Sequence, residues 1–303
     1  MNHKTKIIII GGTGFLGFHL AKFCLKKNWE VVSVSRKKPK KIRFIKEIKY
    51  IFVDIIDKKN LYKKLKNQFD SDYLVNFGGE VEHRKLKKTF LSHYNGLKNL
   101  SDIFLKKSLK KFIQIGSSLE YGKSKSPHKE NFTINPDSNY AKAKALASKR
   151  LLKMHKKYDF PALIVRPYQV YGPYQDLNRF IPTVITNCIK NKTFPCSSGE
   201  QFRDFLFIDD FVKFIFRIIK VKKLKGEIFN VGFGDPMKIK NVIFQIRNLI
   251  GKGRPDIGKI QMRNEESLIF YPSINKAFKL IGWKPRIRFN IGLKKTMEYY
   301  QKY

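Results

Sequence analysis

The chain has few cysteines, three among 303 residues: Cys24, Cys188 and Cys196. They form no Cys-x-x-Cys pair and their number is odd, so the spacing predicts neither a disulfide framework nor a zinc site. The six histidines are scattered as well, and no metal centre is expected. This pattern is typical of a protein from the reducing cytoplasm.

Acidic residues are also scarce, with 24 Asp and Glu against 63 Lys and Arg, a formal net charge of +39. Such a balance can indicate a polyanionic partner such as nucleic acid. The lysines, however, are spread through every segment, which favours a general compositional bias and a solvated basic surface. Nucleic acid is therefore not an expected partner.

Long apolar runs are absent, and no stretch of 18 apolar residues occurs. The first apolar segment, residues 7–10, runs into glycines at positions 11, 12, 14 and 17 and then Lys22, without a small-residue cleavage site. These interruptions argue against a signal peptide or a membrane span. We expect no membrane partner.

Short apolar runs do recur between stretches of helical periodicity. Runs this apolar are typical of strands buried on both faces, and the intervening helices make such strands parallel. The sequence predicts an α/β fold, a Rossmann-type doubly wound parallel sheet. The expected strands are residues 6–10, 30–35, 50–53, 73–76, 111–115 and 162–165.

After residue 173 the alternation of strand and helix patterns becomes less regular. Residues 227–231 are expected to form one further strand, and residues 291–303 a final helix. We expect a Rossmann domain over residues 1–173 and a smaller C-terminal α/β part over 174–303. Parts of about 203–232 are expected to return to the first domain. The second part should bind substrate, because ligands of such folds bind at the carboxyl edge of the sheet.

A glycine-rich turn, Gly11-x-x-Gly14-x-x-Gly17, lies between the first strand and a helical pattern. Glycines there allow a tight turn and close approach of a pyrophosphate, while the helix N-terminus supplies N–H donors. This context predicts a nicotinamide dinucleotide site. The residues expected to touch it are Gly11, Thr13, Gly14, Phe15, Leu16 and Gly17.

The end of the second strand carries cations in place of the acid that favours NAD. Ser35, Arg36 and Lys37 could bind a 2′-phosphate, which indicates NADP(H), with NAD(H) as the alternative. Asp54, beside Ile55 at the end of the third strand, could accept from the adenine amino group.

Tyr140 and Lys144 are one helical turn apart, so their side chains share a face, and a nearby ammonium favours the phenolate. The same spacing follows Tyr62, Tyr94 and Tyr121, so spacing alone does not choose between them. Context favours Tyr140, because it opens a helix after a capping segment and lies 23 residues after Ser117, which follows a buried strand.

With these residues together, the chain resembles the extended short-chain dehydrogenase/reductase family, in its NAD(P)-dependent nucleotide-sugar epimerase, dehydratase and reductase branch. The resemblance covers nearly the whole length. Beyond the glycine turn and the Ser–Tyr–Lys set, it rests on Asn95-Gly96, residues 166–173, Arg203-Asp204-Phe205, Asp209-Asp210, Asn230-Val231-Gly232 and residues 280–285.

The resemblance implies roles for individual residues. Tyr140 would be the acid/base, Ser117 its partner at the substrate oxygen, and Lys144 a modulator of the tyrosine pKa and a ligand of the nicotinamide ribose. Pro167 would also touch the cofactor. The substrate-binding residues would be Ser118, Gln169, Arg203 and Arg263, with both arginines on the diphosphate.

Two departures from the family pattern are informative. Family dehydratases place a glutamate two residues before the Tyr121-Gly122 pair, where this chain has Leu119; Glu120 is adjacent but points elsewhere, by about 100° on a helix. A simple dehydratase is therefore disfavoured. Asn76-Phe77-Gly78-Gly79 replaces a more usual His-Leu-Ala-Ala.

The predicted function is hydride transfer at C4 of a nucleotide-linked hexose, favoured as an NDP-4-keto-6-deoxyhexose reductase. The alternative is an NDP-sugar 4-epimerase with tightly bound NAD. A second alternative is a non-catalytic polyanion-binding protein on the same fold. The helical segments 86–107 and 140–158 match those that pair subunits in the family, so a homodimer is expected.

Overall fold

The computed structural model describes residues 4–80, 86–261 and 267–302. They form two compact units that interleave along the chain. The first comprises Met1–Gly122, Thr133–Pro167 and Val212–Phe229, and the second Lys123–Phe132, Tyr168–Phe211 and Asn230–Tyr303. No described helix is both long and apolar enough to cross a membrane.

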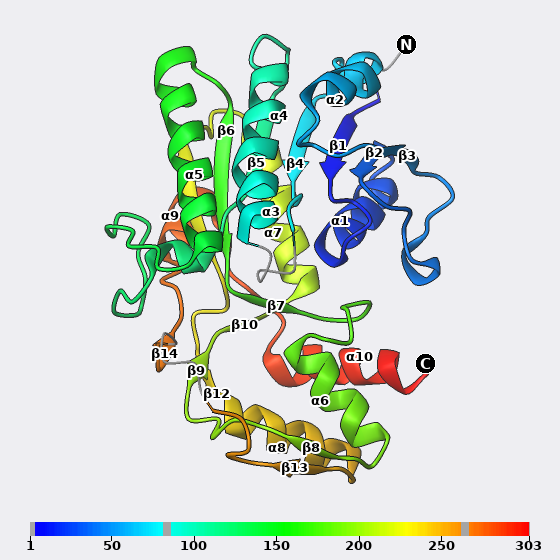
Figure 1. Ribbon diagram of the computed structural model, residues 1–303, viewed down its shortest axis with the longest axis vertical. Coiled ribbons are helices and arrows are strands. Elements are labelled where there is room, and N and C mark those ends of the chain that lie inside the picture. The colour runs from blue at the N-terminus through cyan, green and yellow to red at the C-terminus, as the bar shows by residue number, and fades with distance from the viewer. Residues whose placement is uncertain (1–3, 81–85, 262–266, 303) are drawn as a thin grey trace. The chain divides into compact units, whose positions relative to one another are not determined.

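The first unit is built on a seven-stranded sheet, in the order β11-β6-β5-β4-β1-β2-β3 (Figure 1). Strands β1 to β6 pair in parallel, which confirms the predicted Rossmann-type sheet. The strand order reverses between β1 and β4, the position where such sheets bind ligands at their carboxyl ends. The strands are β1 (Lys6–Ile10), β2 (Glu30–Ser35), β3 (Lys49–Phe52), β4 (Tyr73–Asn76), β5 (Lys111–Ile115), β6 (Ala162–Pro167) and β11 (Glu227–Val231).

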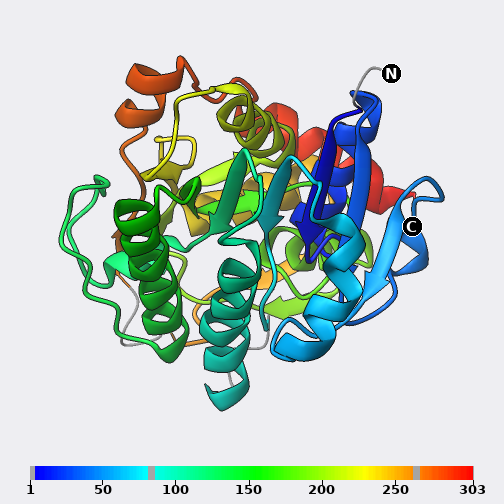
Figure 2. The same cartoon turned by 90° about the horizontal axis from the view of Figure 1, so that it is seen from above.

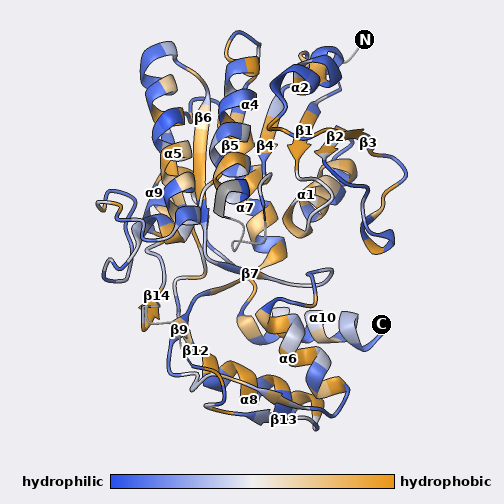
Figure 3. Cartoon of the chain, viewed as in Figure 1, coloured by the Kyte–Doolittle hydropathy of each residue, from blue (hydrophilic) through white to orange (hydrophobic). Residues whose placement is uncertain are grey.

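Helices cover both faces of this sheet (Figure 2). Apolar side chains of α2 (Lys58–Leu65), α4 (Gly96–Phe104) and α5 (Asn139–Tyr158) join one cluster with those of the strands. On the other face, α1 (Phe15–Lys26) meets α7 (Ile208–Lys220) through Phe23 and Phe216, whose ring centroids are 5.1 Å apart. Figure 3 shows β1 and β6 as hydrophobic, consistent with burial on both faces.

Shorter elements of the first unit lie between the main strands and helices. They are the 3₁₀ turns at Lys41–Arg43, Lys66–Gln68 and Ser118–Tyr121, the helix α3 (Leu86–Phe90) and a π-helical turn at Leu91–Asn95.

The second unit contains three small sheets, with strand orders β10-β7, β12-β9-β14 and β13-β8. Its strands are β7 (Gln169–Tyr171), β8 (Thr193–Pro195), β9 (Phe202–Arg203), β10 (Phe205–Phe207), β12 (Met237–Lys238), β13 (Arg254–Asp256) and β14 (Ile269–Phe270). Its helices are α6 (Phe180–Ile189), α8 (Ile239–Ile250), α9 (Asn275–Ile281) and α10 (Phe289–Gln301).

Candidate active site

The glycine turn joins β1 to α1, and its glycines leave little room for a Cβ. Gly11 has φ +75°, and a Cβ on Gly17 would lie 2.4 Å from the Gly11 carbonyl oxygen. Gly14 is the N-cap of α1 and supplies no side-chain acceptor. The first-turn N–H groups, those of Phe15, Leu16 and Gly17, thus have no side-chain cap, and the cradle fits a dinucleotide pyrophosphate.

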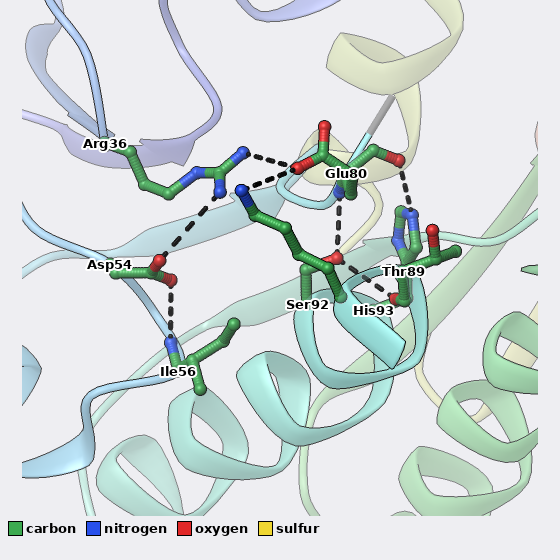
Figure 4. Close-up of polar contacts among 8 residues, drawn as sticks. Arg36, Asp54, Ile56, Glu80, Thr89, Ser92 and His93 are labelled. Carbon is green, nitrogen blue, oxygen red and sulfur yellow. Dashed lines mark hydrogen bonds and ion pairs between the residues drawn. The ribbon is translucent and has the colours of Figure 1, made fainter. Parts of the chain in front are cut away.

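Arg36, at the end of β2, is paired with carboxylates (Figure 4). Its guanidinium lies 3.2 Å from Glu80 Oε2 and 4.0 Å from Asp54 Oδ2. Lys88 Nζ lies 3.6 Å from the same Glu80 oxygen. The charge of Arg36 is therefore offset in part within the protein, while Lys37 beside it is exposed. Glu80 was missed from the sequence, although an acid just after β4 is a visible signal.

Other residues predicted to contact the adenosine lie at or just after the ends of β2 and β3; they are Ser35, Asp54 and Ile55. Ser35 Oγ accepts a hydrogen bond from the N–H of Thr13 at 3.4 Å, which ties β2 to the glycine turn. Asp54 Oδ1 accepts from the N–H of Ile56 at 3.1 Å. Ile55 is buried against Gly96, where a Cβ would lie 2.5 Å from Ile55 Cδ1.

Ser117 follows β5 and caps the 3₁₀ turn Ser118–Tyr121. Its Oγ accepts from the N–H of Leu119 at 3.2 Å, and Glu120 Oε1 accepts from the N–H of Ser117 at 2.8 Å. This capping box fixes the serine and leaves its O–H proton able to donate to a ligand. Ser118 is buried in the same turn, and Pro167 ends the neighbouring strand β6.

Glu120 forms a buried ion pair with Arg166. Its Oε2 accepts from Arg166 Nε at 3.1 Å and from Arg166 NH2 at 2.8 Å, and the two side chains are 0% and 2% exposed. The neighbouring carboxylate raises the pKa of Arg166 against the effect of burial. Since both Glu120 oxygens are engaged, this carboxylate is a structural anchor for Ser117.

Tyr140 and Lys144 lie in the first two turns of α5, which Ser138 caps by accepting from the Ala141 N–H at 3.2 Å. Lys144 is buried, and its Nζ donates to the Ile115 carbonyl at 2.6 Å while lying 5.8 Å from the centroid of the Tyr140 ring. Burial lowers the pKa of Lys144 to about 8, opposed by the charge of Glu120. The structure thus brings the predicted tyrosine and lysine together.

His93 is a neighbour of Tyr140 that the sequence did not single out. It lies in the π-helical turn, and its ring meets the Tyr140 ring edge to face with centroids 4.9 Å apart. His93 Nε2 is 3.0 Å from the carbonyl oxygen of Glu80. A lone histidine in a helical pattern carries no signal for this contact.

The second unit contains a cavity of about 410 Å³ that has both Gln169 and Arg203 in its walls. Arg203 is buried in β9 and donates to the Phe202 carbonyl at 2.7 Å. Gln201, also in the wall, has a buried side-chain oxygen for which the described residues supply no hydrogen-bond partner. Arg263, predicted on the diphosphate, lies outside the described residues.

Asp204, next to Arg203, serves the second unit structurally. It is fully buried and its Oδ1 accepts from the N–H of Phe233 at 2.7 Å. Burial raises the pKa of Asp204 to about 7, although backbone N–H donors oppose the shift. A Cβ at Gly232 would lie 2.4 Å from Asp204 Oδ1, which explains the glycine there.

A sequence model of the NAD dependent epimerase/dehydratase family matches residues 7–232. The chain is 26% identical over 321 residues to dTDP-D-glucose 4,6-dehydratase of Mus musculus, covering 98% of this chain and 89% of that protein. It is 26% identical over 309 residues to CDP-abequose synthase of Salmonella typhimurium, covering 97% and 98%.

Among solved structures, UDP-glucose 4-epimerase with UDP-glucose from Thermotoga maritima matches with a TM-score of 0.92. The sequence identity is 21%, and the match covers 98% of this chain and 99% of that one. At this identity the likeness shows the fold.

Proposed function

Because the chain belongs to the NAD dependent epimerase/dehydratase family, we propose that it acts at C4 of a nucleotide-linked hexose as an NDP-4-keto-6-deoxyhexose reductase. Membership confirms the predicted resemblance and makes the chain an NAD(P)-dependent enzyme of the extended short-chain dehydrogenase/reductase type. Relatives named for nucleotide sugars support the substrate class. The observation that carries the proposal is the buried Lys144 beside Tyr140.

Tyr140 would donate the proton to the C4 oxygen as the sugar is reduced. The Lys144 ammonium beside its ring would favour the resulting phenolate and so ease proton release. The Ser117 hydroxyl, fixed by its capping box, would donate a hydrogen bond to the same oxygen. The nicotinamide would supply the hydride when bound.

The nucleotide would occupy the cavity of the second unit, with Gln169 and Arg203 among its contacts. The Gln201 side-chain oxygen, which has no hydrogen-bond partner among the described residues, suits an N–H donor on the ligand. Arg203, and Arg263 by the family resemblance, would bind the diphosphate.

A simple dehydratase fits less well, although a relative carries that name. Elimination of water needs a general base beyond the tyrosine. Leu119 replaces the expected glutamate, and both carboxylate oxygens of Glu120 are engaged by Ser117 and Arg166.

The favoured cofactor is NADP(H), with Ser35 and Lys37 as its phosphate contacts beside Arg36. The pairing of Arg36 with Asp54 and Glu80 offsets part of that positive charge, and this observation favours the second candidate, a 4-epimerase retaining NAD. In the epimerase, Tyr140 would deprotonate the C4 hydroxyl and later return the proton.

One assay separates the candidates: nucleotide sugars and their 4-keto-6-deoxy forms, incubated with NADH or NADPH while reductant absorbance and product configuration are followed. Consumption of NADPH by a keto sugar supports the reductase, and an inverted C4 without consumption supports the epimerase. Tyr140→Phe should abolish either. No turnover of any substrate would overturn both.

We further propose that the enzyme is a homodimer that pairs through α4 and α5. Leu146 of α5 is 42% exposed, and a partner chain packed on this helix would cover it. Leu146→Glu should convert the dimer to monomer in sedimentation experiments, and a wild-type monomer at micromolar concentration would contradict the proposal.

A further inference from the structure

The π-helical turn gives His93 a position that an α-helix would not. A π turn inserts one extra residue and re-aims the side chains that follow; such turns are frequent at functional sites. Here it places the buried His93 ring edge to face with Tyr140, at 4.9 Å between centroids. His93 therefore touches the residue proposed as the acid/base.

Gly79 forms the seat of this ring. A Cβ at Gly79 would lie 1.9 Å from His93 Cε1 and 2.1 Å from Nδ1, and φ is +145°. Neither the space nor the backbone conformation accepts a side chain. This explains why a glycine stands where the family more often has alanine: the imidazole occupies the volume of that methyl group.

Glu80 holds the ring from a second side (Figure 4). Its carbonyl oxygen lies 3.0 Å from His93 Nε2, and since a carbonyl only accepts, Nε2 is the donor in this hydrogen bond. The N–H of Glu80 donates to Ser92 Oγ at 2.9 Å. The Glu80 carboxylate pairs with Arg36 and Lys88, so the seat is fixed at its outer end as well.

We infer that His93 is a positioning residue that fixes the ring of Tyr140, with Gly79 and Glu80 as its seat. The inference rests on the proposed role of Tyr140. Only one orientation of the phenol places its oxygen for proton transfer, and misplacement by about 1 Å can cost about 100-fold in rate. His93 acts through Tyr140 and makes no contact with substrate in this scheme.

Variants at position 93 separate the ring contact from the hydrogen bond. His93→Phe keeps a ring beside Tyr140 and loses the donor to Glu80; His93→Asn keeps a donor and loses the ring. We expect kcat to fall about 10- to 100-fold in His93→Asn and His93→Ala, less in His93→Phe, with unchanged cofactor Kd in all three.

An activity-independent readout follows the phenol itself. In protein labelled with ¹³C-tyrosine, the Tyr140 ring signals, assigned with Tyr140→Phe, should carry a ring-current shift from His93. His93→Ala should remove that shift. Gly79→Ala should move it as well, because the methyl group displaces the imidazole.

The chain offers a matched control in the same unit. A Cβ at Gly226, φ +73°, would lie 2.2 Å from His155 Cδ2, and His155 Nδ1 is 3.1 Å from the Phe160 carbonyl. This histidine is seated in the same manner but lies 15 residues beyond Tyr140 on α5, about 22 Å away. Gly226→Ala and His155→Ala should alter stability and leave kcat and the Tyr140 signals unchanged.

The outcomes distinguish this inference from the proposed function. If Tyr140→Phe keeps full activity, the proposed function fails and the NMR shifts still test the contact. If Tyr140→Phe is inactive while His93→Ala changes neither kcat nor the Tyr140 signals, the inference alone is overturned. A His93→Asn variant as active as wild type, beside an impaired His93→Phe, would also overturn it.

Discussion

The buried pair of Glu120 and Arg166 offers a sharp test of how the Ser117 turn is held. Glu120→Gln keeps the shape of the side chain and an oxygen that can accept from the Ser117 N–H, now at 2.8 Å from Glu120 Oε1. It removes the charge opposite Arg166, which is 2% exposed. Because arginine stays protonated in proteins, the guanidinium becomes a buried, uncompensated cation.

The cost should be large relative to total stability. Breaking a buried pair by removing one partner costs about 3–5 kcal/mol, against about 5–15 kcal/mol for unfolding a typical domain. In a chain of this size a loss of 1 kcal/mol lowers Tm by about 2 °C, so we expect a fall of about 6–10 °C. Thermal unfolding followed by circular dichroism measures it.

Two further variants make the result specific. Glu30→Gln is the control, because its side chain is 46% exposed and lies 3.6 Å from Lys6; it should cost less than about 1 kcal/mol. Glu120→Gln with Arg166→Met removes both charges and should recover more than half of the loss.

The reasoning would be refuted by a Glu120→Gln protein that loses less than about 1 kcal/mol. It would also fail if this variant kept its Tm but lost turnover. That second result would make Glu120 a proton-transfer group and return the dehydratase to consideration.

Three other predictions follow from single residues. Burial lowers the pKa of Lys144 to about 8, so between about pH 8 and 10.5 the folded state binds fewer protons than the unfolded state. The contribution of Lys144 to the free energy of unfolding should therefore rise over that range by up to about 3 kcal/mol. Lys144→Met should lack that rise in denaturant titrations. The raised pKa of Asp204 has the opposite effect on stability. The contribution of Asp204 to the free energy of unfolding should be complete below pH 3.8 and should be lost as the pH rises through about 7. Asp204→Asn should flatten that pH dependence. Gly17→Ala should weaken cofactor binding at least about 10-fold in fluorescence titrations, because its Cβ would meet the Gly11 carbonyl oxygen at 2.4 Å; unchanged affinity would disprove the cradle.

The strands could be predicted because their signal is local. Residues 7–10 are four consecutive isoleucines, each at most 2% exposed, and a run this apolar and β-branched is typical of a strand buried on both faces. The third strand is displaced by one residue, to Lys49–Phe52, where Lys49 pairs with Val32 of β2, and the sixth runs two residues further than predicted, to Pro167. An edge strand has a neighbour on one side alone and a weaker pattern.

The contacts around the candidate site could not be predicted in the same way. The pairing of Tyr140 with Lys144 follows from helical spacing, but that of His93 with Tyr140 joins residues 47 positions apart through a π turn. Gly79 was visible as a departure from the family pattern. The reason for a glycine there is the His93 ring, which comes from the π-helical turn and fills the space that a Cβ would need.

The two carboxylates that the first unit places beside its candidate catalytic residues argue for chemistry confined to one carbon. Glu120 is neutralised by Arg166 while it holds Ser117, and Glu80 faces Arg36 and Lys88 while its backbone holds His93. A carboxylate whose oxygens are held by an arginine is not free to approach a substrate. This arrangement agrees with the proposal that Tyr140, with Lys144 behind it, is the proton-transfer group. One phenol can serve the oxygen of a single carbinol, as reduction or inversion at C4 requires, whereas loss of water from the next carbons would demand a second group that these ion pairs withhold.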